Sequence, residues 1–228
     1  MTFSIIARCT RTGAMGMAVA SSSPAVAARC AWAQSGAGVV STQNITDPTL
    51  GSRGLERMAR GDSAEAALRH LVDTGHAIEY RQLAVLDTEG GTATYSGRHT
   101  LGVHGSARAA NVAAAGNLLS RPDIPDMMVA QFIAMPDACL GTRLLAAMAA
   151  ALDAGGEAGP IHSAGMLVVE EVAWPVADLR IDWTDGDPIA ELTALWNRWH
   201  PQMRDYVTRA LDPTAAPSYG VPGDPGKR

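Results

Sequence analysis

Apolar and polar positions along the chain predict groups of strands separated by groups of helices. Residues 3–8 are β-prone, residues 12–16 contain the glycines of a hairpin turn, and residues 17–20 form a continuous apolar run. A short apolar run bounded by turn residues is typical of a strand buried on both faces. Chain ends normally fray unless they are held in place, so a terminus in a buried sheet is unusual. The pattern predicts that the first strand lies in the core.

Similar patterns predict the other elements. Further strands are expected at residues 36–43, 81–87, 92–96, 111–115, 163–171 and 178–183, with a loop at 44–48 and a hairpin turn at 88–91. Helices are expected at residues 49–60, 63–73, 125–134 and 138–153, and a last one begins at Asp187. Residues 25–33 form either a short helix or an irregular connection. Asp62 and Asp137 are predicted N-caps, Gly75 ends a helix, and Pro201 kinks or restarts the last one.

The order of these elements indicates the fold class. Strands and helices occur in separate runs, whereas a doubly wound parallel sheet would alternate them. We therefore expect an α+β protein, a sandwich of two antiparallel sheets between helical layers. Residues 1–211 are predicted to form a single domain. Residues 212–228 are rich in proline and glycine, which predicts a disordered tail.

Composition narrows the classes of function. The 228 residues are 47% hydrophobic and 18% charged, with a net charge of −5 and no Lys/Arg run, which argues against nucleic-acid binding. Lys227 is the single lysine, so a Schiff-base or phosphate-binding lysine is not expected. Three cysteines without CxxC spacing disfavour a disulfide framework or a zinc site. We expect no metal and no cofactor.

The sequence also bears on where the protein is located and on what it binds. No charged segment precedes an apolar one at the start of the chain, and the Ala-rich stretch at 146–152 is too short to span a bilayer. These features predict a cytoplasmic protein that binds no membrane. Unpaired sheet edges and the apolar face of the Trp-bearing helix near the C-terminus would be buried by contact with another copy of the chain. This predicts a homodimer or a higher homo-oligomer.

Thr2 is the first candidate for chemistry. Met1 precedes a small residue, a context in which the initiator Met is normally removed, so the mature chain is expected to begin at Thr2. A threonine hydroxyl beside a free α-amino group combines a nucleophile with a base whose ordinary pKa is about 7.7–8.0. The alternative is that Thr2 merely permits the removal of Met1.

Several motifs together resemble the bacterial DUF1028 family. The resemblance covers about residues 1–200 and is carried by residues 2–8, 12–21, 38–43, 116–119, 163–169 and 178–182. It implies the αββα fold of the N-terminal-nucleophile (Ntn) hydrolases, in a family whose members are mostly uncharacterised. The first two strands also resemble the opening of a proteasome β-subunit, in which a polar residue near the end of the second strand supports a leading threonine. Ser21 occupies that place here.

The chain departs from these patterns in two places. No residue corresponds to the proteasome-like lysine, so Arg8 or Arg180 is the candidate for a positive charge near the nucleophile. The DUF1028 family commonly has an acidic residue where this chain has Cys9. We interpret Cys9 as a small buried hydrophobic residue rather than a reactive thiol.

Other polar residues are candidates for the same site. Asn117 follows a glycine at a strand end and is a candidate oxyanion donor, or it caps its own turn. Thr42 and Gln43 end another strand, where they either bind substrate or satisfy the strand terminus. Arg180 shares one strand face with the aspartates two residues to either side. That face binds a substrate carboxylate or, as we prefer, is an exposed edge.

These candidates lead to a main hypothesis and two alternatives. The main hypothesis is an Ntn amidohydrolase that cleaves a C–N bond in a small amide, imide or ureido compound. The first alternative is a non-catalytic Ntn-like protein that binds a small metabolite or forms an oligomer. The second is a metal-dependent hydrolase of cyclic amides or lactams that uses His99 and His104, although these two loop histidines alone are a weak metal signal.

Overall fold

Two antiparallel sheets form the centre of the computed structural model, which describes residues 2–221. Sheet A has the strand order β10-β9-β2-β1-β8-β7, and sheet B has the order β3-β4-β5-β6. The strands of sheet A are β1 (Thr2–Arg8), β2 (Met15–Ser21), β7 (Gly105–Ala109), β8 (Val112–Asn117), β9 (Ser163–Val169) and β10 (Ala177–Ile181). Those of sheet B are β3 (Ala31–Gln34), β4 (Gly38–Asn44), β5 (Arg81–Asp87) and β6 (Thr92–Ser96). The predicted α+β class with antiparallel sheets is confirmed.

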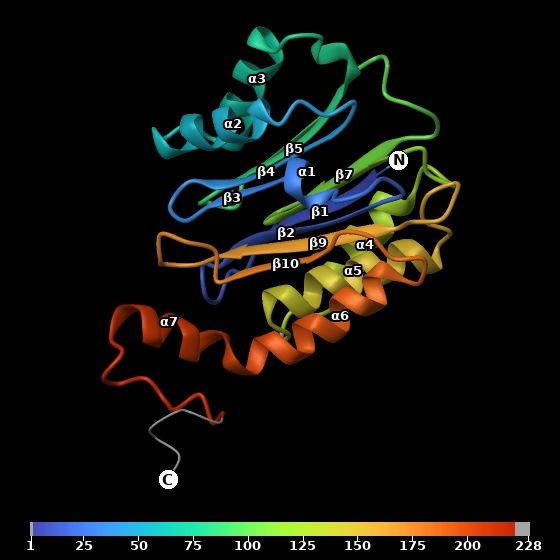
Figure 1. Cartoon of the computed structure of the whole chain (residues 1–228). Coiled ribbons are helices and arrows are strands. Elements are labelled where there is room, and N and C mark those ends of the chain that lie inside the picture. Colours follow the sequence, from blue (N-terminus) through green and yellow to red (C-terminus); the bar gives the residue numbers. More distant parts are fainter. Residues whose placement is uncertain (1, 222–228) are drawn as a thin grey trace.

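Helices cover the outer faces of the two sheets (Figure 1). Helices α2 (Thr49–Ala59) and α3 (Ala64–Thr74) pack on sheet B, while α4 (Ile124–Ile133), α5 (Leu140–Asp153) and α6 (Pro188–Trp199) pack on sheet A. The shorter elements are α1 (Ala27–Cys30), α7 (Met203–Leu211) and the 3-10 turns η1 (Ile78–Tyr80) and η2 (His200–Gln202). Of the helices in the described part of the chain, none combines the length and apolar character that crossing a membrane requires.

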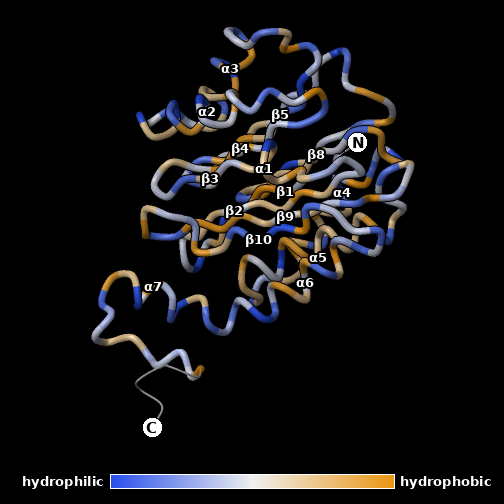
Figure 2. Tube along the Cα trace, in the orientation of Figure 1, coloured by the Kyte–Doolittle hydropathy of each residue, from blue (hydrophilic) through white to orange (hydrophobic). Residues whose placement is uncertain are grey.

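Alternate side chains of β1 contribute to two separate hydrophobic layers, one on each face of sheet A. Phe3 and Ile5 pack with the helices below sheet A, whereas Ile6 packs between the sheets. Because successive side chains point to opposite faces of a sheet, Thr2 and Ser4 lie on the same face as Ile6. Figure 2 shows hydrophobic residues concentrated along the central strands. The first strand is therefore buried on both faces, as its sequence predicts.

The same alternation in sheet B decides which side chains meet sheet A. Val39 of β4 packs between the sheets, while Val40 packs against the α2–α3 layer. In β5, Ala84 and Leu86 face sheet A, whereas Leu83 packs against the α2–α3 layer. Ser41, Gln43 and Gln82 continue the inward-facing set. The layer between the sheets is consequently apolar along most of its length and polar at one end.

The strand β7 was not predicted, because residues 96–106 are rich in polar residues and glycine and resemble a loop. It forms because it pairs with β8 at the edge of sheet A. Strand β3 begins within residues 25–33, where a short helix or irregular connection was expected, and α1 directly precedes it. Both strands are short and lie at sheet edges, where tertiary pairing outweighs weak local preference.

Two of the predicted helix caps are wrong. Ser63, not Asp62, is the N-cap of α3, and its hydroxyl accepts a hydrogen bond from the Ala66 N–H. Asp62 instead forms an ion pair with Arg57 at 2.6 Å. Helix α5 begins after Cys139 without a side-chain cap, so Asp137 does not cap it. The predicted start of the last helix at Asp187 is confirmed: Asp187 is the N-cap of α6, and its carboxylate accepts hydrogen bonds from two backbone N–H groups.

The structure near the C-terminus agrees with what its prolines predict. Pro201 lies in η2, between α6 and α7, so the last helix restarts there as predicted. Residues 212–221 contain no helix or strand and are largely exposed. Residues 222–228 of the predicted tail, like Met1, lie outside the described residues. The single-domain boundary at residue 211 and the disorder of the tail stay predictions.

Candidate functional site

The polar end of the layer between the sheets brings together side chains from five strands. Its members are all buried: Thr2 and Ser4 on β1, Ser21 on β2, Asn117 on β8, Ser41 and Gln43 on β4, and Gln82 on β5. A buried polar group is costly unless it is hydrogen-bonded. Such a concentration of polar side chains in a core is therefore a candidate functional site.

Thr2 lies between the two strands that flank β1. Its hydroxyl donates a hydrogen bond to the Ser21 hydroxyl at 3.3 Å, and its backbone is in register with Asn117 of β8. Only 5% of the surface of Thr2 is exposed. The structure thus brings together the three residues that the sequence analysis named as catalytic candidates.

Ser21 connects Thr2 to a positive charge through a second hydroxyl. The Ser21 and Ser23 hydroxyls are 2.9 Å apart, and Nη2 of Arg29 donates to Ser23 Oγ at 2.6 Å. Arg29 comes from the short helix α1 and also bonds to the carbonyl groups of residues 24 and 25. Sequence reasoning missed Arg29, since one arginine in an uncertain segment gives no signal of its own.

Gln82 links the two sheets at the polar end. Its Oε1 accepts hydrogen bonds from Asn117 Nδ2 at 3.1 Å and from Gln43 Nε2 at 2.9 Å. Its own Nε2 donates to the Gly116 carbonyl oxygen and to the Ser96 hydroxyl, both at 3.0 Å. Sequence reasoning missed Gln82, although an amide in an otherwise apolar strand was an available signal.

Gln43 belongs to this network, whereas its neighbour Thr42 does not. Ser4 Oγ donates to Gln43 Oε1 at 2.7 Å, which joins β1 of sheet A to β4 of sheet B. Thr42 lies on the opposite face of β4, and its hydroxyl donates to the backbone oxygen of Asp47. Of these two predicted substrate-binding residues, the structure brings only Gln43 to the polar end.

Glu157 is a buried carboxylate beside this end that sequence reasoning also missed. It is 4% exposed, and its Oε2 accepts a hydrogen bond from the Ser22 N–H at 3.3 Å. Burial raises the pKa of the Glu157 carboxyl to about 7, against opposing contributions from the positive amino terminus and from Ser22. A single acidic residue in a glycine-rich loop carries no pattern from which its burial was predictable.

The two arginines predicted to bind substrate lie elsewhere. Arg8 is at the opposite end of β1, about 20 Å from Thr2 at the usual rise of a strand, and it bonds to Asn111. Arg180 is on the edge strand β10 and makes two hydrogen bonds to the half-exposed Asp178. This placement agrees with the exposed-edge interpretation of that strand face.

The histidines proposed for a metal alternative make unrelated contacts. His99 stacks on Tyr80 with ring centroids 4.7 Å apart, and His104 bonds to the Gly102 carbonyl oxygen. Within residues 2–221 no three His, Cys, Asp or Glu side chains converge as metal ligands would. The absence of a metal or cofactor from the reaction stays a prediction.

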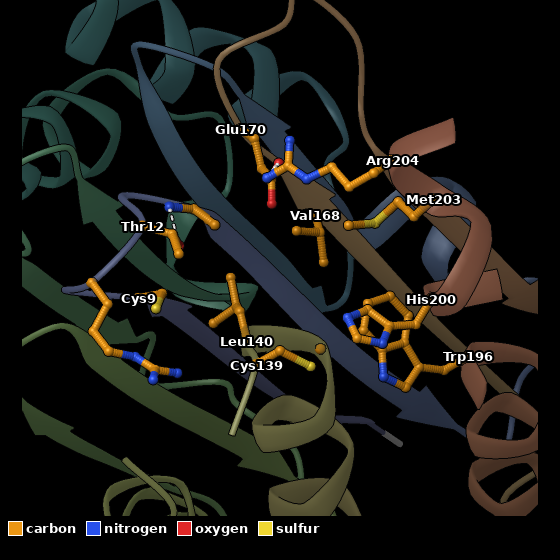
Figure 3. A pocket seen from close by; sticks show the side chains of 13 residues that line it. Cys9, Thr12, Cys139, Leu140, Val168, Glu170, Trp196, His200, Met203 and Arg204 are labelled. Carbon is orange, nitrogen blue, oxygen red and sulfur yellow. Dashed lines mark hydrogen bonds and ion pairs between the residues drawn. The ribbon is translucent and has the colours of Figure 1, made fainter. Parts of the chain in front are cut away.

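A cavity of about 220 Å³ lies on the helix side of sheet A, at the end of β1 away from Thr2. Figure 3 shows Cys9, Leu140 and Trp196 around it, with the Glu170–Arg204 ion pair at one side. Cys9 is 2% exposed and belongs to the hydrophobic core, in agreement with its interpretation as a buried small residue. The cavity is separate from the polar end.

Comparisons with known proteins place the chain in a family. The crystal structure of protein SPO2555 from Silicibacter pomeroyi is 31% identical and superposes with a TM-score of 0.82, covering 90% of this chain and 94% of that one. Anbu (ancestral beta-subunit) from Yersinia bercovieri matches at 11% identity and a TM-score of 0.35, over 90% of this chain and 97% of that one, which is too low to bear on fold or activity. Among curated proteins, no sequence matches this chain. Residues 2–192 match the family described as "Family of unknown function (DUF1028)", and the chain therefore belongs to the DUF1028 family.

Proposed function

We propose that the protein is an Ntn amidohydrolase that cleaves a C–N bond in a small amide, imide or ureido compound. In this proposal Met1 is removed and Thr2 becomes the N-terminal nucleophile. The observation that carries the proposal is the position of Thr2, which begins a central strand whose residues 2–7 are buried, and which bonds to Ser21 at the polar end of the layer between the sheets. We also propose that the helices and sheets stack as the four-layer αββα sandwich of the Ntn hydrolases.

The proposed reaction has two steps. Thr2 Oγ1 attacks the substrate carbonyl carbon, its proton passes to the Thr2 α-amino group, and that proton leaves with the nitrogen of the broken C–N bond. Water then hydrolyses the resulting ester and restores the threonine. Ser21 and Ser23 orient the attacking hydroxyl, and the guanidinium of Arg29 supplies the positive charge behind them.

Asn117 is the proposed side-chain donor for the oxyanion. Its register position opposite Thr2 places it beside the nucleophile, and its hydrogen bond to Gln82 fixes the amide plane. One N–H of this amide is used by Gln82, and an amide nitrogen carries two. Loss of one oxyanion donor typically lowers a catalytic rate by about 10²–10³.

Intact mass spectrometry with a β-lactone probe tests the nucleophile. The native-terminus protein is expected to lack Met1 and to gain one probe, located on Thr2 by peptide mapping. Thr2→Ala is expected to stay folded and to remain unlabelled, because it removes only the hydroxyl and one methyl group. Thr2→Ser is the matched control, since it keeps the hydroxyl and is expected to be labelled.

Two results would contradict the proposal. One is retention of Met1 in the purified native protein. The other is a folded wild-type protein, verified by circular dichroism, in which Thr2 stays unlabelled at every pH tested. Either result would leave a non-catalytic, metabolite-binding protein as the better description of this fold.

A further inference from the structure

We propose that Glu157 is the positioning residue for the α-amino group of Thr2, holding it by an ion pair once Met1 has been removed. This inference rests on the proposed function and adds a residue to it from outside the five strands. Glu157 lies between α5 and β9, where its backbone forms an antiparallel bridge with Leu119. Its role would be to orient and charge the base, not to touch the substrate.

The backbone around Glu157 places it beside Thr2. Its bridge partner Leu119 is two residues beyond Asn117, and Asn117 is in register with Thr2. Its hydrogen-bond donor Ser22 follows Ser21, whose hydroxyl bonds to Thr2. Glu157 thus bridges the ends of the two strands that flank β1, at the end of β1 where the chain begins.

Two buried acceptor atoms at this place call for donors. Among the described residues, Glu157 Oε1 and Asn117 Oδ1 are buried and have no hydrogen-bond partner. Leaving a buried polar group without a partner destabilises the folded state, and does so more strongly for a charged group. A freed α-ammonium group provides three N–H donors and a positive charge. Removal of Met1 would create this group at Thr2, whose backbone is in register with Asn117 and whose hydrogen-bond partner Ser21 precedes the Ser22 that bonds to Glu157.

The charge that acts on the Glu157 carboxyl is that of the amino terminus, and the basic side chains closest in sequence to Ser22, Leu119 and Glu157 have other partners. Arg29 is directed at Ser23 and at backbone oxygens, and Arg121 is paired with Asp123 at 2.6 Å. His162, at the far end of the same loop, lies 3.8 Å from Asp185. These groups already have partners, so the carboxylate and the α-ammonium stabilise each other's charged form.

Such an ion pair changes the pH dependence of the nucleophile. The amine accepts the Thr2 hydroxyl proton only when it is neutral, so acylation falls as pH drops below the amine pKa. A carboxylate within about 4–6 Å raises that pKa by about 1–3 units. Removal of the carboxylate charge is therefore expected to extend acylation to lower pH while reducing its maximal rate, because the amine is less well oriented.

The test is the pH profile of β-lactone acylation, followed by intact mass, in the native-terminus protein. The acidic limb of this profile is the pH range in which the acylation rate falls as the pH drops. Glu157→Gln is expected to move this limb down by about one pH unit and to lower the maximal acylation rate about tenfold. Glu157→Asp keeps the charge and is expected to return the limb toward the wild-type position. The matched control is Glu170→Gln, the same change in a partly buried glutamate beyond the opposite end of β1, which is expected to leave the profile unchanged.

Failure of this inference is distinguishable from failure of the proposed function. An unchanged acidic limb in folded Glu157→Gln, with acylation still occurring, would overturn the role of Glu157 and leave Thr2 as nucleophile. If the wild type is never acylated, an NMR titration of the ¹⁵N-labelled Thr2 amine in the processed chain still tests Glu157. An amine pKa that is the same in wild type and in Glu157→Gln would then overturn the ion pair.

Discussion

Gln82 holds the polar end together because its amide bonds to groups from both sheets. It accepts from Asn117 and Gln43, which places a donor from sheet A and a donor from sheet B on one oxygen atom. Both donors are buried, and Gln82 Oε1 is the acceptor that each of them uses. At the scale of single residues, Gln82 therefore supports the proposed oxyanion donor without contacting the nucleophile.

Replacement of Gln82 by leucine is expected to destabilise the fold by about 3 kcal/mol, since two buried amide groups lose their acceptor. Chemical denaturation of the variant and of the wild type measures the difference. The control is Gln34→Leu, a change at an exposed position at the end of β3, expected to alter stability by less than about 0.5 kcal/mol. Equal effects at the two positions would contradict the structural role of Gln82.

The helix ends show that a cap depends on geometry as well as residue type. The Asp187 carboxylate accepts hydrogen bonds from the N–H groups of Ile189 and Ala190 at 2.8 and 3.1 Å. Asp137 has the same side chain but lies two residues before Cys139, the N-cap of α5. At the scale of elements, α6 is thus stabilised by its cap, and α5 depends on its packing against sheet A and α6.

Asp187→Ala is expected to lower the free energy of unfolding by about 1 kcal/mol, because two N–H groups at the start of α6 lose their acceptor. Asp137→Ala is the matched control, with an expected change below about 0.5 kcal/mol. Thermal or urea unfolding of the two variants gives the comparison. A larger loss for Asp137→Ala than for Asp187→Ala would show that the cap assignment is reversed.

The whole molecule places a titrating carboxyl group in its interior. Glu157 is separated by 155 positions in the sequence from Thr2, and the bridge to Leu119 brings its loop to the polar end. Its pKa is about 7 in the folded chain and 4.5 as the ordinary value. The folded state therefore binds this proton more tightly than the unfolded state does.

This difference makes stability depend on pH in a chain that retains Met1. The contribution of Glu157 is complete below pH 4.5, decreases as pH rises to 7 and is lost above it, a total of about 3 kcal/mol. Unfolding by denaturant at a series of pH values measures the slope. Glu157→Gln cannot ionise, so its unfolding free energy is expected to lack this decrease, and a persistent identical slope would assign it to other groups.

The sequence by itself determined the burial of β1 and the types of the strands and helices other than the edge strands β3 and β7. Hydrophobic periodicity and turn residues are local, so they identify elements such as the helix that begins at Asp187 and the hairpin behind Thr2. Position at strand ends also made Gln43 and Asn117 predictable as site candidates, and the resemblance to the opening of a proteasome β-subunit indicated Ser21. Thr42 lies on the other face of β4, because a shift of one residue along a strand reverses the face.

Tertiary structure alone decided what surrounds Thr2. Arg29, Gln82 and Glu157 come from a short helix, a strand of the second sheet and a loop after α5, and no local pattern links them. Helix α1 brings Arg29 to Ser23, six residues earlier in the chain. The contacts of Gln82 with Asn117 and of Glu157 with Ser22 arise instead from strand order and from the packing of the sheets. Such long-range contacts depend on the three-dimensional register of distant segments, which propensity and periodicity do not encode.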